Sequence, residues 1–168
     1  EDNGTTSEAV VEFVIFPKAF LEECNCMTET VKGSVFLKWV GSQLMVGIDS
    51  RGVPIVIGSH ADREPKGQGL KASDLLLLAA AACATYDVVM ILTKQRQPLD
   101  SLEVICTGEQ ESEPPYRFLH IHLHYVVRGE IDSQKLEKAI QLSEEKYCSV
   151  TNTLKSSVRV TSDYQLFN

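Results

Sequence analysis

Two cysteines carry the strongest chemical signal in this chain. Cys83 stands in the apolar stretch LLLLAAAACATYDVV, residues 75–89, and Cys148 stands in the segment EEKYCSV. If two helices bring these thiols together, one thiolate can attack a peroxide, and the other thiol can condense with the resulting sulfenic acid to give a disulfide. The alternative stays open at this point, because a free cysteine packs as a small hydrophobe and is inert in most cores.

A reactive thiol needs a neighbouring positive charge. We expect Cys83 about ten residues inside its helix, too far from the N-terminus for the helix dipole to act on it. Arg63, in the charged, glycine-rich segment HADREPKGQGLKA just before that helix, is the nearest cation in sequence. A lone loop arginine is more often simply solvated. A cation is nevertheless needed, because burial in an apolar wall raises the pKa of a thiol.

Three histidines alternate in HIHLHY, at positions 120, 122 and 124. On a strand they share one face, and three imidazoles on one face are a known zinc ligand set. The intervening Ile121 and Leu123 would then form the buried face, so the histidines would point to solvent. We therefore predict an exposed histidine row and no metal. The pair Cys24 and Cys26 also lacks the second pair of ligands that zinc sites use.

Composition excludes several classes of function. The formal net charge is -7, with five cysteines in 168 residues, and the pI is about 5.1. Nucleic acid is therefore not expected as a partner, because phosphate binding needs a basic face. An odd number of scattered cysteines favours a reducing, cytoplasmic compartment. The apolar run holds Asp87, which is costly in lipid, so we expect a buried helix and no membrane partner.

Hydrophobic periodicity places the elements in the order of three strands, a long helix, two strands, a second helix and a final strand. A hairpin is expected over 29–49 with its turn at Gly41 and Ser42. The further strands are predicted at 52–59, 101–110, 117–129 and 157–167, and the helices at 73–95 and 132–147, the second capped by Asp132 or Ser133. Segregated strands and helices indicate an α+β fold with an antiparallel sheet and two helices.

The first predicted helix is apolar on every side in its first half. Such a helix must be central and covered all round, and one small sheet with one further helix barely supplies that cover. A partner subunit would supply it. We therefore predict an obligate homodimer with this helix near the interface.

Three segments resemble one known family. LKASDLLLLAAAACATYDVVMILTKQRQPLDSLEV resembles the central helix region of the OsmC/Ohr family, the osmotically inducible and organic-hydroperoxide-resistance proteins, and the match is closest to its OsmC-like branch. FLHIHLHYVV and LEKAIQLSEEKYCSV resemble the family's later strand and second helix. The resemblance divides the chain into an N-terminal extension, 1–26, and an OsmC-like domain, 27–168.

The resemblance implies an intertwined α+β homodimer with active sites at the dimer interface. It implies that Cys83 is the peroxidatic cysteine and Cys148 the resolving cysteine. Arg63 falls, counting back without gaps, where the family has its active-site arginine. The family's active-site glutamate lies near the start of the central helix, where this chain has Ser73 and Asp74; Asp74 is the candidate substitute, with a side chain one methylene shorter.

The implied function is a thiol-dependent peroxidase that reduces alkyl or fatty-acid hydroperoxides with two cysteines and no metal, flavin or other cofactor. A small thiol or a lipoyl dithiol would recycle the disulfide. The alternative is a weakly catalytic or non-catalytic binding protein with an apolar cleft, which the missing glutamate favours. A third possibility is an interaction component that docks on a larger assembly through residues 1–26.

Overall fold

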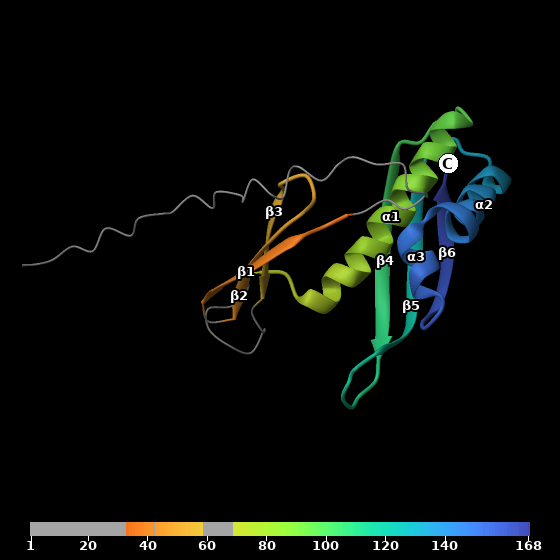
Figure 1. Ribbon diagram of the computed structural model, residues 1–168. Coiled ribbons are helices and arrows are strands. Elements are labelled where there is room, and N and C mark those ends of the chain that lie inside the picture. Colours follow the sequence, from red (N-terminus) through yellow and green to blue (C-terminus); the bar gives the residue numbers. More distant parts are fainter. Residues whose placement is uncertain (1–32, 42, 59–68) are drawn as a thin grey trace, which may run out of the picture. The chain divides into compact units, whose positions relative to one another are not determined.

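The computed structural model describes residues 33–41, 43–58 and 69–168 (Figure 1). Within it, Val35–Asn168 belong to one compact unit. The predicted extension 1–26, its boundary with the domain, the Cys24 and Cys26 pair and Arg63 all lie outside the described residues. The predictions made for them therefore stay predictions.

The first sheet is a three-stranded antiparallel meander in the order β1-β2-β3. Its strands are β1 (Phe36–Gly41), β2 (Leu44–Ile48) and β3 (Pro54–Gly58). The predicted hairpin is confirmed, and Gly41 at its turn has a φ of 114°, a conformation that favours glycine. Asp49 organises the next turn, where its Oδ1 accepts hydrogen bonds from the backbone N–H groups of Arg51 at 2.9 Å and Val53 at 2.8 Å.

This first sheet leaves large apolar side chains uncovered. Leu37 is 56% exposed, Val40 50% and Val56 45%. A small sheet is stable only when a face of it is packed against something else. The described part of the chain leaves these side chains in contact with solvent, so their cover has to come from elsewhere.

The second sheet is mixed, in the order β4-β5-β6. Its strands are β4 (Ser101–Gln110), β5 (Phe118–Arg128) and β6 (Arg159–Phe167). β4 pairs antiparallel with β5, as expected, but β5 pairs parallel with β6. The purely antiparallel sheet that the sequence predicts is corrected here, because the helices between β5 and β6 carry the chain back to the end of the sheet where β5 began.

The helical segments are α1 (Ala72–Lys94), α2 (Ser133–Leu142), a π-helical turn η2 (Ser143–Tyr147) and α3 (Ser149–Leu154). Asp132 caps α2 as predicted, since its side chain accepts hydrogen bonds from the N–H groups of Gln134 and Lys135. The helix predicted over 132–147 is confirmed as α2 followed directly by the π-helical turn η2, and the short helix α3 is an addition that the sequence does not predict. The described residues thus contain three α-helices where the sequence predicts two.

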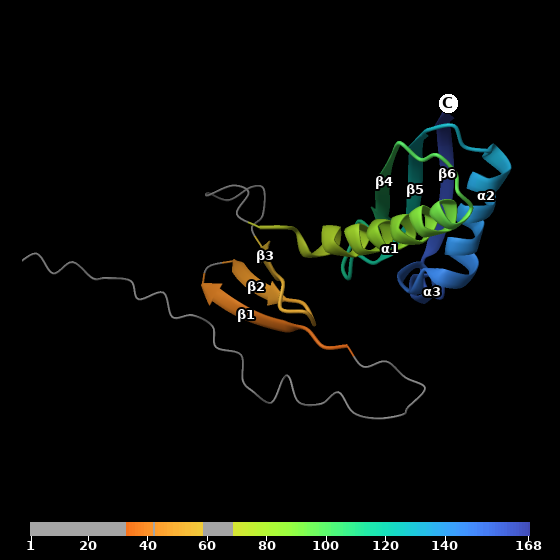
Figure 2. The same cartoon turned by 90° about the horizontal axis from the view of Figure 1, so that it is seen from above.

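The core lies between the helices and one face of the second sheet (Figure 2). Every fourth residue of α1 from Ala80 to Leu92 is fully buried, and so are alternate residues of β5 from Ile121 to Val127. The helix period and the strand period therefore each place one apolar stripe on the core. The second helix adds Leu136, Ala139 and Ile140.

Among the residues that the structure describes, α1 is buried along one face only. Leu78 remains 52% exposed, Tyr86 67% and Met90 38%. The helix is long and apolar enough to cross a membrane by length and composition, a test that core helices of soluble proteins also pass. Its buried stripe packs on the sheet, and its Asp87 accepts a hydrogen bond from Ser143, which is the arrangement of a core helix.

The buried stripe of α1 gives a first test of this fold. We predict that Leu92→Ala lowers the free energy of unfolding by about 2–5 kcal/mol, because Leu92 is fully buried and the truncation leaves a cavity. Thr93→Ala, at the exposed neighbouring position, is the matched control and should change stability little. Chemical denaturation followed by circular dichroism measures both. Equal effects of the two substitutions would contradict the placement of this face.

Candidate functional site

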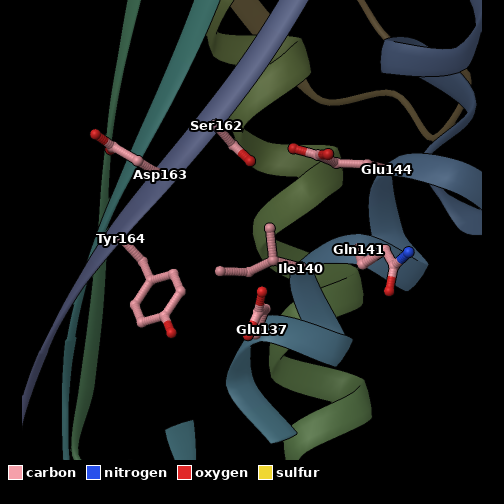
Figure 3. A pocket seen from close by; sticks show the side chains of 7 residues that line it. All are labelled: Glu137, Ile140, Gln141, Glu144, Ser162, Asp163 and Tyr164. Atoms are coloured by element: carbon pink, nitrogen blue, oxygen red, sulfur yellow. The ribbon is translucent and has the colours of Figure 1, made fainter. Parts of the chain in front are cut away.

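One hollow lies between α2, η2 and β6 (Figure 3). It has a volume of about 350 Å³, and its polar lining includes Glu137, Glu144 and Ser162. Ile140 and Tyr164 supply its apolar side. Neither of the two predicted catalytic cysteines lines this hollow, so it is separate from the thiol chemistry that the sequence predicts.

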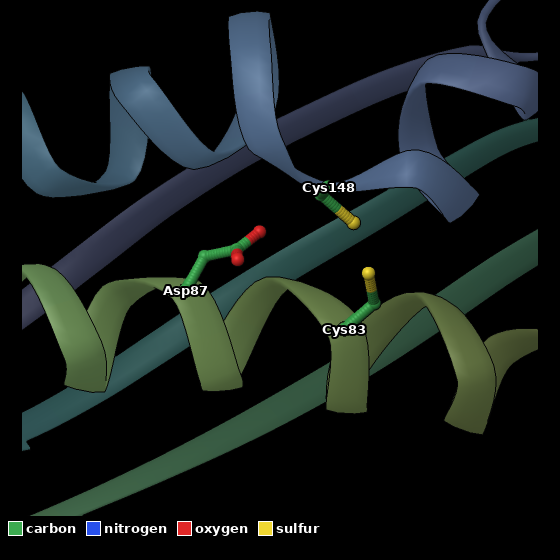
Figure 4. A group of neighbouring side chains, drawn as sticks. All are labelled: Cys83, Asp87 and Cys148. Carbon is green, nitrogen blue, oxygen red and sulfur yellow. The ribbon is translucent and has the colours of Figure 1, made fainter. Parts of the chain in front are cut away.

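The structure brings Cys83 and Cys148 together from different elements (Figure 4). Cys83 lies in the middle of α1, and Cys148 lies at the junction of η2 and α3. Their sulfur atoms and a carboxylate oxygen of Asp87 lie within 4.8 Å of one another. Both cysteines are free thiols. The convergence that a two-cysteine reaction requires is therefore present.

The interruption between α2 and α3 is what aims Cys148 at α1. Its N–H bonds to the carbonyl of Ser143, five residues back, at 2.9 Å, and the backbone at Cys148 is then extended, with φ −69° and ψ 101°. Cys148 is the N-cap residue of α3, and its sulfur accepts a hydrogen bond from the N–H of Thr151 at 3.5 Å. The helical backbone thus ends at Tyr147, and the extended Cys148 separates it from α3.

Ser143 fastens this junction to α1. The side chain is fully buried, and its hydroxyl lies 3.2 Å from Asp87 Oδ2 and 3.4 Å from the carbonyl oxygen of Ala84. Both partners are on the turn of α1 that follows Cys83. Because a buried hydroxyl and a carboxylate each need a hydrogen-bond partner, this contact fixes the distance between the two cysteine-bearing segments.

The two thiols differ in their surroundings. Cys148 is fully buried, whereas Cys83 is half-buried, with its sulfur 4.0 Å from the hydroxyl oxygen of Ser149. Burial raises the pKa of the Cys148 thiol above its ordinary value; the hydrogen bonds from Thr151 oppose this rise, and neighbouring Cys83 adds to it. Cys148 is thus held as a neutral thiol, and Cys83 is the more accessible of the two.

Tyr125 lies beneath the pair, on the core face of β5. Its side chain is fully buried, and among the described residues its hydroxyl has no hydrogen-bond partner. Burial raises the pKa of Tyr125 well above its usual range, and the nearby acidic groups of Glu144 and Cys148 add to the rise. The phenol therefore stays protonated beside the thiols.

The other predicted site residues are placed differently. Asp74 is in the first turn of α1, where its carboxylate is exposed and 3.9 Å from Lys71 Nζ. It precedes Cys83 by nine residues, which is about 13.5 Å along a helix axis, so the two do not meet within one chain. Arg63 lies outside the described residues. The catalytic roles of Asp74 and Arg63 stay predictions.

Sequence reasoning assigned no role to Asp87 or Ser143. For Asp87 a signal was available in the sequence, because Asp87 follows Cys83 by four residues and the two therefore lie on one face of the helix. For Ser143 the sequence holds no comparable signal, because its contact to Asp87 crosses 56 positions of the chain. Two thiols and a carboxylate are also a ligand set that suits zinc, so a metal would compete with redox chemistry for the same atoms.

Comparison with known proteins assigns this chain to a protein family. The family model described as OsmC-like protein matches residues 65–163. Protein YhfA of Escherichia coli strain K12 is 36% identical over 132 residues, which cover 77% of this chain and 95% of YhfA. The chain belongs to the family of OsmC-like proteins.

Solved structures agree with this assignment. An OsmC-like protein from Mycoplasma pneumoniae has a TM-score of 0.71 at 17% identity, over 82% of this chain and 99% of that one. An organic hydroperoxide resistance protein OsmC from Legionella pneumophila has a TM-score of 0.63 at 14% identity, over 82% and 99%. At these identities the likeness shows the fold, and the site has to be argued from this chain.

The difference between the two thiols predicts an order of chemical modification. Thiolates react with iodoacetamide and thiols do not, so the raised pKa of Cys148 should make its alkylation lag behind that of Cys83 at neutral pH. Raising the pH should narrow the gap as Cys148 ionises. Peptide mass spectrometry after timed labelling measures both sites separately. Labelling in denaturant is the control, and faster modification of Cys148 in the native protein would contradict the assignment.

Proposed function

We propose that this protein is a thiol-dependent peroxidase that reduces organic hydroperoxides through Cys83 and Cys148. The observation that carries the proposal is the convergence of the two sulfur atoms, from segments 65 positions apart, to within 4.8 Å. A bonded pair needs about 2.05 Å between sulfurs, so a small side-chain movement separates the reduced pair from the disulfide.

In the first step the Cys83 thiolate attacks the distal oxygen of the hydroperoxide. The O–O bond breaks, the alkoxide leaves and takes up a proton as the alcohol, and Cys83 becomes a sulfenic acid. In the second step the sulfur of Cys148 attacks that of Cys83, the S–S bond forms, and the hydroxyl leaves as water. Two electrons have then passed from two thiols to one peroxide.

The second step requires a proton to move from Cys148 to the leaving hydroxyl. The carboxylate of Asp87 lies within 4.8 Å of both sulfur atoms. It is held there by the Ser143 hydroxyl, and it has a second oxygen free of that hydrogen bond. Asp87 is therefore placed to accept the proton of one thiol and to return it at the other.

The surroundings of Cys83 favour an apolar substrate. The outward residues of α1 near it are small and apolar, among them Ala79 and Ala82, and both are exposed. An alkyl or fatty-acid hydroperoxide can cover this surface with its tail while its O–O group reaches the half-buried thiol. Names of related proteins as organic hydroperoxide resistance proteins support the same substrate class.

Turnover needs a dithiol or two thiols to reduce the Cys83–Cys148 disulfide by exchange. A small thiol or a lipoyl dithiol serves this purpose, and both belong to the reducing cytoplasm in which we expect the protein. The proposed catalyst is a homodimer, since apolar side chains on α1 and on the first sheet remain exposed in the single chain and a second copy would bury them.

The two-step reaction predicts different fates for the wild type and two variants. Wild-type protein should lose two thiols per chain on reaction with cumene hydroperoxide. Cys83→Ser should reduce peroxide consumption to background because the attacking sulfur is gone, and Cys148→Ser should stop at a sulfenic acid on Cys83 that dimedone traps. Thiol titration and mass spectrometry measure these outcomes.

Cys106→Ser is the matched control, because Cys106 is a free, half-buried thiol outside the pair, and it should consume peroxide like the wild type. Thiol loss that does not depend on Cys83 would contradict the proposal. A stoichiometric apolar ligand in purified protein that consumes no peroxide would favour the alternative function, a binding protein of the OsmC-like fold.

The exposed apolar face of α1 predicts the oligomeric state. We expect a dimer at micromolar concentration in sedimentation velocity, and we expect Leu78→Glu to shift it toward monomer by burying an unpaired charge at the interface. Lys135→Glu, an exposed change on α2, is the control and should stay dimeric. A wild-type monomer would contradict the interface.

A further inference from the structure

The face of the second sheet opposite the helices carries a cluster of polar side chains. His120, His122 and His124 share it, as the alternation predicts, while Ile121 and Leu123 point to the core. The parallel register of β6 then brings Thr161 beside His122 and Asp163 beside His124. The sequence alone could not show this, because 39 residues separate each pair.

Three side chains of this cluster converge on one point. One ligand atom each from His122, His124 and Asp163 lies within 4.8 Å of the others. His122 Nε2 is 3.4 Å from Asp163 Oδ1, and His124 Nδ1 hydrogen-bonds to that same oxygen. Two ligands of a tetrahedral zinc ion lie about 3.3 Å apart when the bonds are near 2.0–2.1 Å, so the spacing of His122 and Asp163 suits a metal, and a bound ion would replace the hydrogen bond between His124 and Asp163.

A hydrogen bond at the Nδ1 atom of His122 fixes the orientation of its imidazole ring. Its Nδ1 lies 2.8 Å from Thr161 Oγ1, which leaves Nε2 directed at Asp163. Metal-binding histidines characteristically bond their other ring nitrogen in this way, which sets the tautomer and the ring angle. His120 is oriented differently, since its Nε2 bonds to Thr161 at 2.7 Å and its Nδ1 faces Glu109 at 3.8 Å.

The cluster is open to ions from solvent. The side chains of His122 and His124 are 31% and 26% exposed, and that of Asp163 is 60% exposed. Imidazole and carboxylate are the ligands that first-row divalent ions take in proteins, and three of them leave a coordination position for water. The site is separate from the thiol pair, which lies on the helix-covered side of the same sheet.

We propose that His122, His124 and Asp163 bind one divalent first-row transition metal ion, with Thr161 as the positioning residue that orients His122. The exposed histidine row expected from the sequence is thus a ligand set once β6 is in place. This inference does not depend on the proposed peroxidase function.

Isothermal titration calorimetry, in which the reduced, full-length protein is titrated with Zn²⁺, tests the proposal. We expect one zinc ion per chain at this site, lost in His122→Ala and in Asp163→Asn. Thr161→Val keeps the ligands and removes only the hydroxyl, and it should weaken zinc binding by about ten- to a hundredfold. His120→Ala is the matched control and should bind zinc like the wild type. Circular dichroism checks that each variant is folded.

Titration with Co²⁺ locates the bound ion, because cysteine ligation adds an intense sulfur-to-cobalt charge-transfer band that histidine and carboxylate ligation lacks. We expect visible d–d bands that depend on His124 and no such sulfur band. Absence of zinc binding, binding unchanged in His122→Ala and Asp163→Asn, or a cobalt–sulfur band that places the ion at Cys83, Asp87 and Cys148 instead would each overturn the proposal.

Discussion

The proximity of Cys83 and Cys148 depends on the break between α2 and α3. At that break the chain makes one π-helical turn and leaves Cys148 with an extended backbone, so its sulfur faces α1. The buried hydroxyl of Ser143, hydrogen-bonded to Asp87, holds the break against the turn of α1 that follows Cys83. Helical irregularities of this kind are frequent at functional sites, and here the irregularity is what makes the two thiols neighbours.

The rest of the domain serves to hold that contact rigid. One stripe of α1 packs on the inner face of β5, and α2 packs on both, so neither cysteine-bearing segment can move without disturbing a close-packed core. The same packing gives the thiols different surroundings. Cys148 lies inside the core as a neutral thiol, while Cys83 lies at its edge, where substrate can approach.

Much of this architecture was predictable from sequence, because it follows from local patterns. Neighbouring residues determine the hydrophobic periodicity of β4, β5 and α1, and also the helix cap at Asp132. The bounds of β4 are the predicted ones. The residue pattern singled out Cys83 and Cys148, and the resemblance to a family implied their roles. The parallel pairing of β5 with β6 and the π-helical turn that begins at Ser143 were missed, because both are set by how distant segments pack.

The same distinction applies to the polar groups. A histidine at every second position fixes a shared face but not the neighbours on it, and the partners Thr161 and Asp163 come from a strand that the sequence predicts to be antiparallel. Likewise, the exposed α1 residues Leu78 and Tyr86 show that a pattern can require burial without identifying the surface that provides it.

The most direct test of the account is peptide mapping of the protein after reaction with one equivalent of cumene hydroperoxide under non-reducing conditions. The account predicts a single new cross-link, between the peptides that hold Cys83 and Cys148, which disappears on reduction with a dithiol. A disulfide that joins Cys83 to any other cysteine, or a Cys83 that stays a sulfenic acid while Cys148 remains a free thiol, would contradict it.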